Sequence, residues 1–243
     1  MKQPDRTLVA ALDPFMTAHG FKFIKSREVY IRKTSLGFDD FSWSSYPLAT
    51  GEKWAAGYYE GGYGLGLRSN AIEAVSRIVM PIHGVDNERY AFTVYRGVGA
   101  HGDYFAFAPS RDRELFLRFD HLEADVAETV QRIEAMLEAD GWAWYQRYAD
   151  PVALSRDINE PVGGHVPHPL VNNSGHRHLV GIAAACVGEP ERVGELVDAW
   201  LVAISEWDAQ YADERPAMAP DVARKFDLIV KKARELGYPV KAR

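Results

Sequence analysis

The chain has 243 residues, of which 47% are hydrophobic and 26% are charged. This balance is typical of a globular protein and argues against extended disorder. The formal net charge is −6, whereas a protein that binds nucleic acid regardless of sequence needs excess Lys and Arg to neutralise phosphates. We therefore expect no nucleic-acid partner, and the single cysteine excludes an internal disulfide.

The N-terminal segment MKQPDRTLVAALDPF has no extended apolar core and no small-residue cleavage site, so no signal peptide is predicted. The longest nearly apolar run, residues 179–188, is far shorter than the roughly 20 residues of a membrane-spanning helix. A cytoplasmic location without membrane contact is the expectation.

The first half of the chain is predicted to contain one helix followed by strands. Residues 5–19 place apolar side chains at helical spacing, with Pro14 expected to kink or divide the helix and Gly20 to cap it. Strand-like segments, about five strands in all, cover residues 21–33, 38–46, 57–69, 89–97 and 113–119. The glycines within residues 57–66 suggest bulges or close approach of another backbone, and Asn70 is a candidate N-cap for a short helix.

From residue 122 onward the hydrophobic period becomes helical. Val126, Val130, Ile133 and Leu137 form one stripe, and Gly141 is predicted to end that helix. Further helices are expected over residues 142–150, 151–159, 179–187, 191–212 and 221–236, with a loop over residues 160–176.

The change of period near residue 120 predicts an α+β fold, in which an antiparallel sheet from the N-terminal half packs with helices from the C-terminal half. No shift in composition marks a domain boundary. We therefore predict a single domain over residues 1–243, β-rich over about 1–120 and helical over about 121–243.

A cluster of histidines is the most chemical-looking feature of the sequence. His165, His168, His176 and His178 lie close together as HVPH and HRH, and imidazole is a good ligand for zinc, copper, nickel and iron. The same segment is rich in Pro, Asn and Gly, as ordinary loops are. We expect no tight metal site and no cofactor, and metal binding by these histidines is kept as the alternative.

Signatures of catalysis are absent. The glycines of residues 61–66 do not match the spacing of a dinucleotide-binding turn or a phosphate loop. No G-x-S-x-G motif accompanies His101 and Asp103. Cys186 lies in an apolar run, which predicts a buried and unreactive thiol, and Asp39 and Asp40 are predicted to lie on a solvated face.

Charge and aromatic side chains are unevenly distributed in the second half. Acidic residues dominate residues 122–140 and 186–215, so these helices are either solvated faces or a surface complementary to a basic partner. In the second case the steering side chains would be Glu123, Asp125, Glu128, Asp198, Glu206 and Asp208. Trp144 and Tyr148 would be the anchors, because binding hot spots favour Trp and Tyr; otherwise both rings are core.

Two segments resemble a family of uncharacterised bacterial domains. The first, LDPFMTAHGFKFIKSREVYIRK, is a helix that ends in a G-F-K turn before strands, and the second is VQRIEAMLEADGWAWYQRYADPVAL. Some domains of this kind look like immunity proteins, which bind and neutralise toxins exchanged between bacteria. The resemblance implies a binding role and transfers no catalytic residue.

The leading hypothesis is therefore a non-enzymatic cytoplasmic binding protein that neutralises a basic protein, such as a toxin, by direct contact. The alternative is a metal-binding protein or metal-dependent enzyme that uses the four histidines. A structural or oligomer-forming protein without a separate ligand is the third hypothesis.

Overall fold

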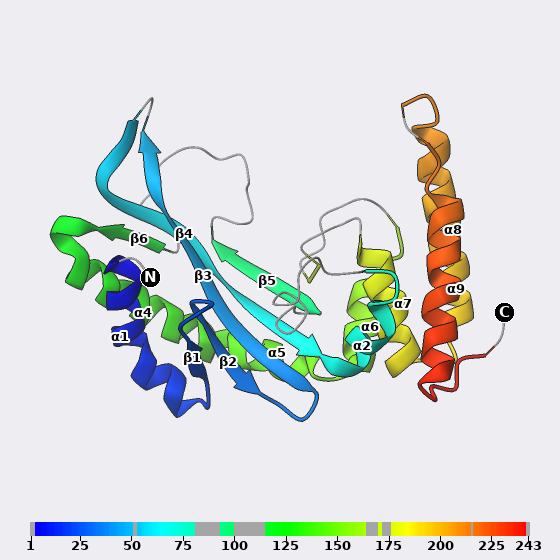
Figure 1. Cartoon of the computed structure of the whole chain (residues 1–243), viewed down its shortest axis with the longest axis horizontal. Coiled ribbons are helices and arrows are strands. Elements are labelled where there is room, and N and C mark those ends of the chain that lie inside the picture. The colour runs from blue at the N-terminus through cyan, green and yellow to red at the C-terminus, as the bar shows by residue number, and fades with distance from the viewer. Residues whose placement is uncertain are drawn as a thin grey trace. The chain divides into compact units, whose positions relative to one another are not determined.

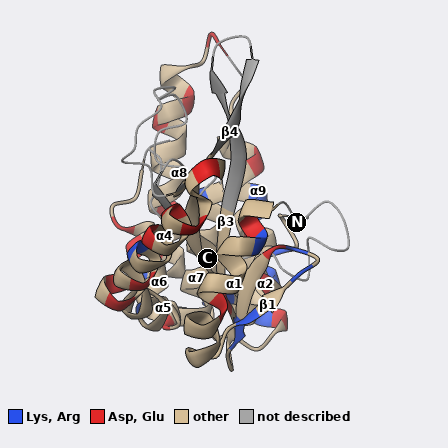
Figure 2. Cartoon of the chain, turned by 90° about the vertical axis from the view of Figure 1, so that its left-hand side faces the viewer, with Lys and Arg blue, Asp and Glu red and all other residues tan. Residues whose placement is uncertain are grey.

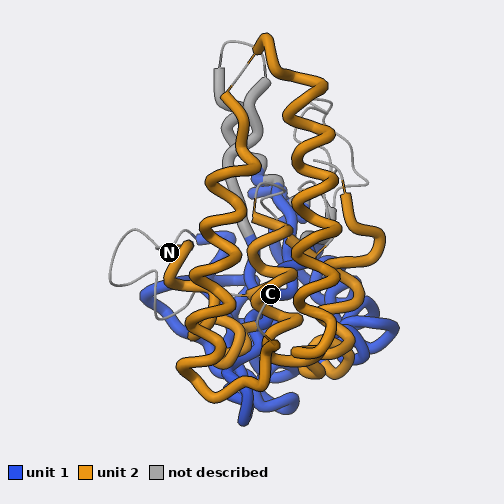
Figure 3. The backbone as a smooth tube through the Cα atoms, turned by 90° about the vertical axis from the view of Figure 1, so that its right-hand side faces the viewer, with its two compact units in different colours: residues 1–67, 95–145 blue, residues 68–94, 146–243 orange. Residues whose placement is uncertain are grey.

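A computed structural model describes residues 3–50, 53–80, 93–99, 115–163, 170–171, 176–214 and 216–241. These residues form an α+β protein (Figure 1). The chain divides into two compact units (Figure 3): unit 1 comprises residues 1–67 and 95–145, and unit 2 comprises residues 68–94 and 146–243.

Unit 1 is built on an antiparallel sheet. Its strands are β1 (Lys22–Ile24), β2 (Val29–Lys33), β3 (Gly37–Thr50), β4 (Lys53–Ser69), β5 (Val94–Gly99) and β6 (Leu115–Arg118). The order is β1-β2-β3-β4-β5, and β6 also pairs with β4. β2 is antiparallel to β1 and β3, and β6 is antiparallel to β4. The predicted fold class is therefore confirmed, with six strands in the described residues rather than about five.

Helix α1 (Gln3–Ala18) packs against the first strands of unit 1. Leu8, Leu12 and Met16 are completely buried, and the Tyr30 hydroxyl of β2 donates to the Val9 carbonyl at 3.2 Å. Of the two predicted effects of Pro14, division of the helix does not occur, because α1 continues through it, and a kink stays a prediction. Proline leaves a carbonyl one turn earlier without its helical donor, and that turn is exposed to water.

The second helical layer of unit 1 is one continuous path. α4 (Leu122–Met136) passes through a five-residue π-helical turn, η2 (Leu137–Gly141), into α5 (Trp142–Tyr148). Gly141 therefore does not end the helix, contrary to the prediction. A Cβ atom at Gly141 would lie 2.8 Å from Leu137 Cδ2, so a side chain there would force the buried Leu137 to shift. The predicted stripe is confirmed, since Val126, Ile133 and Leu137 are at most 2% exposed.

The glycine-rich strand β4 has the close approach that its sequence suggested. A Cβ atom at Gly64 would lie 1.9 Å from the hydroxyl oxygen of Tyr95, which belongs to the neighbouring strand β5. Glycine is required at this position because the Tyr95 ring occupies the space of a side chain.

Unit 2 is helical. Its helices are α2 (Asn70–Ser76), α6 (Pro151–Asn159), α7 (Arg177–Gly188), α8 (Val193–Gln210) and α9 (Ala219–Glu235). The N-cap of α2 is Ser69 rather than the predicted Asn70, because the Ser69 side chain accepts from the Ile72 amide at 3.4 Å. The ends of α8 and α9 that join through residues 211–218 extend beyond the other helices of the unit (Figure 3).

Helix α7 lies at the centre of unit 2 and is almost wholly buried. The His178 ring contacts Trp200 of α8 and Phe226 of α9, with centroid distances of 6.0 and 5.8 Å. Asn159 of α6 accepts from the Trp200 indole at 2.8 Å and donates to the Gly181 carbonyl at 3.0 Å. These hydrogen bonds satisfy buried polar groups and join three helices, α6, α7 and α8.

Candidate protein-binding surfaces

The exposed face of α4 carries two of the predicted steering residues. Glu123 and Glu128 are exposed, whereas Asp125 is 6% exposed. Asp125 is held by the Arg118 guanidinium at 2.6 Å and 2.9 Å and by the Arg118 amide at 2.8 Å. These hydrogen bonds keep the pKa of Asp125 below its usual value. Asp125 therefore ties α4 to the end of β6, and its charge is already paired.

Further exposed acidic residues lie just before and just after α4 in the chain, and Figure 2 marks acidic residues in red. The side chain of Asp120 is 78% exposed and that of Glu138 is 57% exposed. The basic residue of α4, Arg132, is half-buried and donates to the Thr129 hydroxyl at 3.5 Å. Alanines 124, 127 and 135 are also exposed between the acids. We call Asp120, Glu123, Glu128 and Glu138 together the α4 acidic face.

Helix α8 in unit 2 carries the other predicted acids, with two different roles. Asp198 and Glu206 are exposed. Asp208 accepts from the backbone amides of Met218 and Ala219, both at 2.7 Å. It thus caps the start of α9, where helix amides lack intrahelical partners. The local sequence does not reveal this cap, because the amides lie ten and eleven residues further along the chain.

The two predicted aromatic anchors differ in burial. Trp144 is 7% exposed and packs edge-on against Tyr145 at 5.3 Å. The Tyr148 hydroxyl donates to Asp157 at 2.8 Å, and burial together with this carboxylate raises the pKa of Tyr148 to about 12. Trp144 therefore lies in the core, whereas Tyr148 is half-buried and its role as an anchor stays a prediction.

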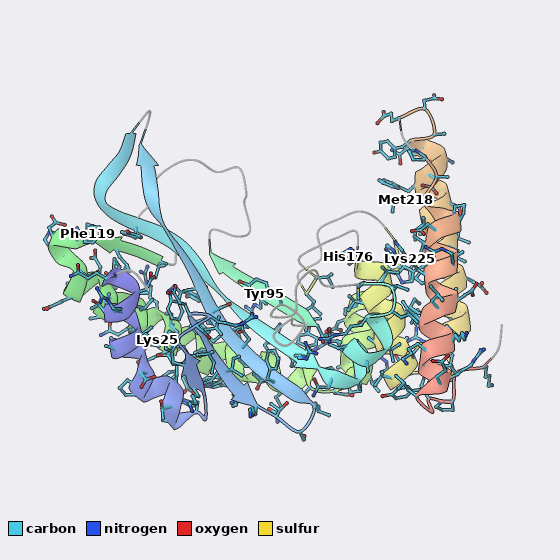
Figure 4. The ribbon with its side chains drawn as sticks, in the orientation of Figure 1. Lys25, Tyr95, Phe119, His176, Met218 and Lys225 are labelled. Carbon is cyan, nitrogen blue, oxygen red and sulfur yellow. The ribbon has the colours of Figure 1, made fainter. Side chains whose placement is uncertain are left out.

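An aromatic pair that the sequence analysis missed lies at the far end of α8. Trp207 and Tyr211 are half-buried and in ring contact at 5.3 Å. Met218, also half-buried, lies near the same end of the hairpin (Figure 4). The i, i+4 spacing of two aromatics in an acidic segment is the sequence signal for this pair.

The histidines do not form a metal site in the described residues. His165 and His168 lie outside them. His178 is 5% exposed within the core, and His176 lies near Lys225 (Figure 4), whose charge adds to burial in lowering the His176 pKa. A lysine ammonium repels a metal cation, and no group of three or more His, Cys, Asp or Glu is placed to hold one among the residues that the structure describes.

The carboxylates of β3 are buried, which corrects the prediction of a solvated face. Asp39 is 4% exposed and pairs with Arg32 of β2 at 2.7 Å. Asp40 is 6% exposed, and burial raises its pKa to about 7 despite a hydrogen bond from Ser42 and the charge of Arg27. The error arose because the partners come from a neighbouring strand and turn, which local sequence does not place.

Cys186 is completely buried, as predicted, and burial raises the pKa of its thiol to about 12. Its lack of reactivity stays a prediction. His101 and Asp103 lie outside the described residues.

No helix in the described part of the chain combines the length and apolar character needed to cross a membrane. No protein-family model matches the chain, and neither a curated protein nor a solved structure matches it.

Proposed function

We propose that the chain is a non-enzymatic binding protein of the bacterial cytoplasm that neutralises a basic protein, such as a toxin, by direct contact. The observation that carries the proposal is the α4 acidic face, where acidic side chains are exposed and the basic residue of the helix, Arg132, is turned inward to Thr129. An exposed row of one charge attracts a partner of the opposite charge and suppresses contacts with like-charged surfaces.

The shape of the α4 acidic face also suits protein contact. Exposed alanines separate Glu123, Glu128 and Glu138, and short side chains let a partner surface approach the helix closely. Asp125 does not take part, because Arg118 already neutralises it. Glu123 and Glu128 are therefore the residues to which we assign steering.

The acidic residues Asp198 and Glu206 of α8 belong to the other unit and form a separate candidate surface. The same charges disfavour nucleic acid, whose phosphates they would repel. The proposal requires no cofactor, because partner binding needs only the surface side chains.

Site-specific photocrosslinking tests this function even while the partner is unidentified. A photoreactive residue at Ala127, between Glu123 and Glu128 on α4, is compared with one at Ala11, which is exposed on α1. In cells of the source strain we expect a covalent adduct with one basic protein from position 127 and not from position 11.

Confirmation requires that the captured protein be toxic when produced alone and harmless when this chain is produced with it. Glu123→Lys/Glu128→Lys should weaken this protection. The proposal is wrong if position 127 yields no adduct, or the same adducts as position 11.

A further inference from the structure

Phe119 is an exposed aromatic side chain at the start of the α4 acidic face. It is 44% exposed, and it is the one aromatic among the large hydrophobic residues that are exposed in the described part of the chain. It lies in a 3-10 turn, η1 (Phe119–His121), that leads from β6 into α4 (Figure 4). Apolar surface of this kind gains free energy when a partner covers it.

The Phe119 ring is held in place by its neighbours in unit 1. Strand register pairs Tyr59 of β4 with Leu117 of β6, two residues before Phe119, and the rings of Phe119 and Tyr59 meet edge-on at 5.4 Å and 74°. The backbone just before the ring is fixed as well, because Asp125 accepts from both the amide and the guanidinium of Arg118. A side chain that is fixed before binding loses less conformational freedom when a partner arrives.

The surroundings of Phe119 along the chain are acidic. The Asp120 side chain is 78% exposed, and the exposed Glu123 follows Phe119 by four residues on the same helical path, which brings the two side chains to neighbouring positions. Residues 119–131 contain no Lys or Arg. His121 approaches Asp120 at 3.6 Å and is a cation only when it is protonated. The ring is therefore flanked by two exposed carboxylates.

We propose that Phe119 anchors the basic partner by taking one of its arginine side chains, whose guanidinium stacks on the ring between Asp120 and Glu123. A cation over an aromatic face is attracted by the ring electrons. The planar guanidinium also pairs with carboxylates through two parallel hydrogen bonds, whereas a lysine ammonium is compact and strongly hydrated. The inference rests on the proposed function and adds the residue type that the partner presents to this surface.

The anchor supplies what acidic side chains alone lack. Exposed charges speed association and contribute little affinity each, whereas a covered aromatic side chain at an interface contributes to affinity by slowing dissociation. Trp144 does not fill this role, because it lies in the core. Steering and anchoring therefore fall on different residues of one surface, and they should affect different rate constants.

Binding of two labelled peptides to the full chain tests the inference before the partner is identified. Fluorescence anisotropy at low ionic strength compares hexa-arginine with hexalysine, which carry the same charge, and the wild type should bind hexa-arginine more tightly. Phe119→Leu keeps an apolar side chain but removes the ring, so it should lower the affinity for hexa-arginine by about threefold to tenfold. Phe119→Tyr should retain the preference for arginine. Glu123→Lys/Glu128→Lys should weaken both peptides alike.

Leu36→Ala is the matched control, because Leu36 is 43% exposed in the turn between β2 and β3 of the same unit. This variant should leave both affinities unchanged, and thermal melts establish that every variant is folded. The inference is overturned if the wild type binds neither peptide or binds the two equally. It is also overturned if Phe119→Leu keeps the wild-type affinity for hexa-arginine, even where Glu123→Lys/Glu128→Lys weakens both peptides.

The protein captured by photocrosslinking at Ala127 separates the anchor from the proposed function. Phe119→Leu should speed its dissociation several-fold and leave its association rate nearly unchanged, because the ring is covered only in the bound state. A captured protein that leaves Phe119→Leu and the wild type at the same rate overturns the anchor. Its capture and neutralisation would still support the proposed function.

Discussion

Asp40 is a buried carboxyl group whose protonation is coupled to folding. Its pKa is raised to about 7 by burial, whereas in the unfolded chain it is close to about 3.9. Between these two values the folded state holds a proton that the unfolded state has lost. The free energy of unfolding therefore falls as pH rises, by about 1.4 kcal/mol per pH unit for this group, and levels off above pH 7.

Asp40→Asn should remove this fall in the free energy of unfolding with rising pH, because an amide does not ionise. The variant should be clearly more stable than the wild type above pH 7 and differ little from it near pH 4. Urea titrations at several pH values measure this difference. A stability difference that does not change with pH would mean that Asp40 does not titrate in this range.

A substitution of Trp144 tests whether this residue stabilises the core or anchors a binding partner. Because it is 7% exposed, Trp144→Ala should lower the free energy of unfolding by about 3–5 kcal/mol. At a temperature where the variant is still folded, its affinity for the partner should be nearly that of the wild type. Thermal melts and a binding titration check the two halves; unchanged stability with lost binding would restore Trp144 as an anchor.

Among elements, the start of α9 depends on a side chain of α8. Asp208 accepts from the amides of Met218 and Ala219, and removing such a cap costs about 1 kcal/mol. In Asp208→Ala, hydrogen exchange should speed up at the amides of residues 218–222 while the rest of unit 2 stays protected. Glu206→Ala is the matched control, since it removes an exposed acid from the same helix; equal effects in both variants would argue against the cap.

The periodic elements could be predicted because their signal is local. The apolar stripes of α1 and α4 place whole segments. The failed predictions about the acidic residues depend on distant contacts. Burial of Asp39 rests on Arg32, which strand register brings opposite it, and the role of Asp125 rests on Arg118 at the end of β6. Among the steering candidates, residue type alone did not distinguish the exposed Glu123 from the buried Asp125.

At the scale of the whole molecule, the boundary between the two units falls within continuous elements. It crosses β4 after Leu67 and α5 after Tyr145. A break inside a strand or a helix is costly, because it interrupts the hydrogen bonds of that element. If the chain is a single domain, as predicted, it should unfold in a single cooperative transition.

Calorimetry tests that expectation directly. We predict one heat-absorption peak whose calorimetric and van't Hoff enthalpies agree. Two resolved transitions, with Asp40→Asn moving only one of them, would instead mean that the units unfold separately. The measurement should be repeated at several protein concentrations, so that any self-association is separated from unfolding.

The central claim is that the α4 acidic face steers a basic partner, and association kinetics with the captured protein test it most directly. Stopped-flow rates at low and high ionic strength are compared for the wild type and Glu123→Lys/Glu128→Lys. We predict that the variant associates at least several-fold more slowly at low ionic strength and depends less on salt, whereas its dissociation rate changes little. Glu191→Lys, which changes an exposed acid outside both candidate surfaces, is the control for charge elsewhere. Equal association rates and equal salt dependence in the wild type and the α4 variant would contradict the account.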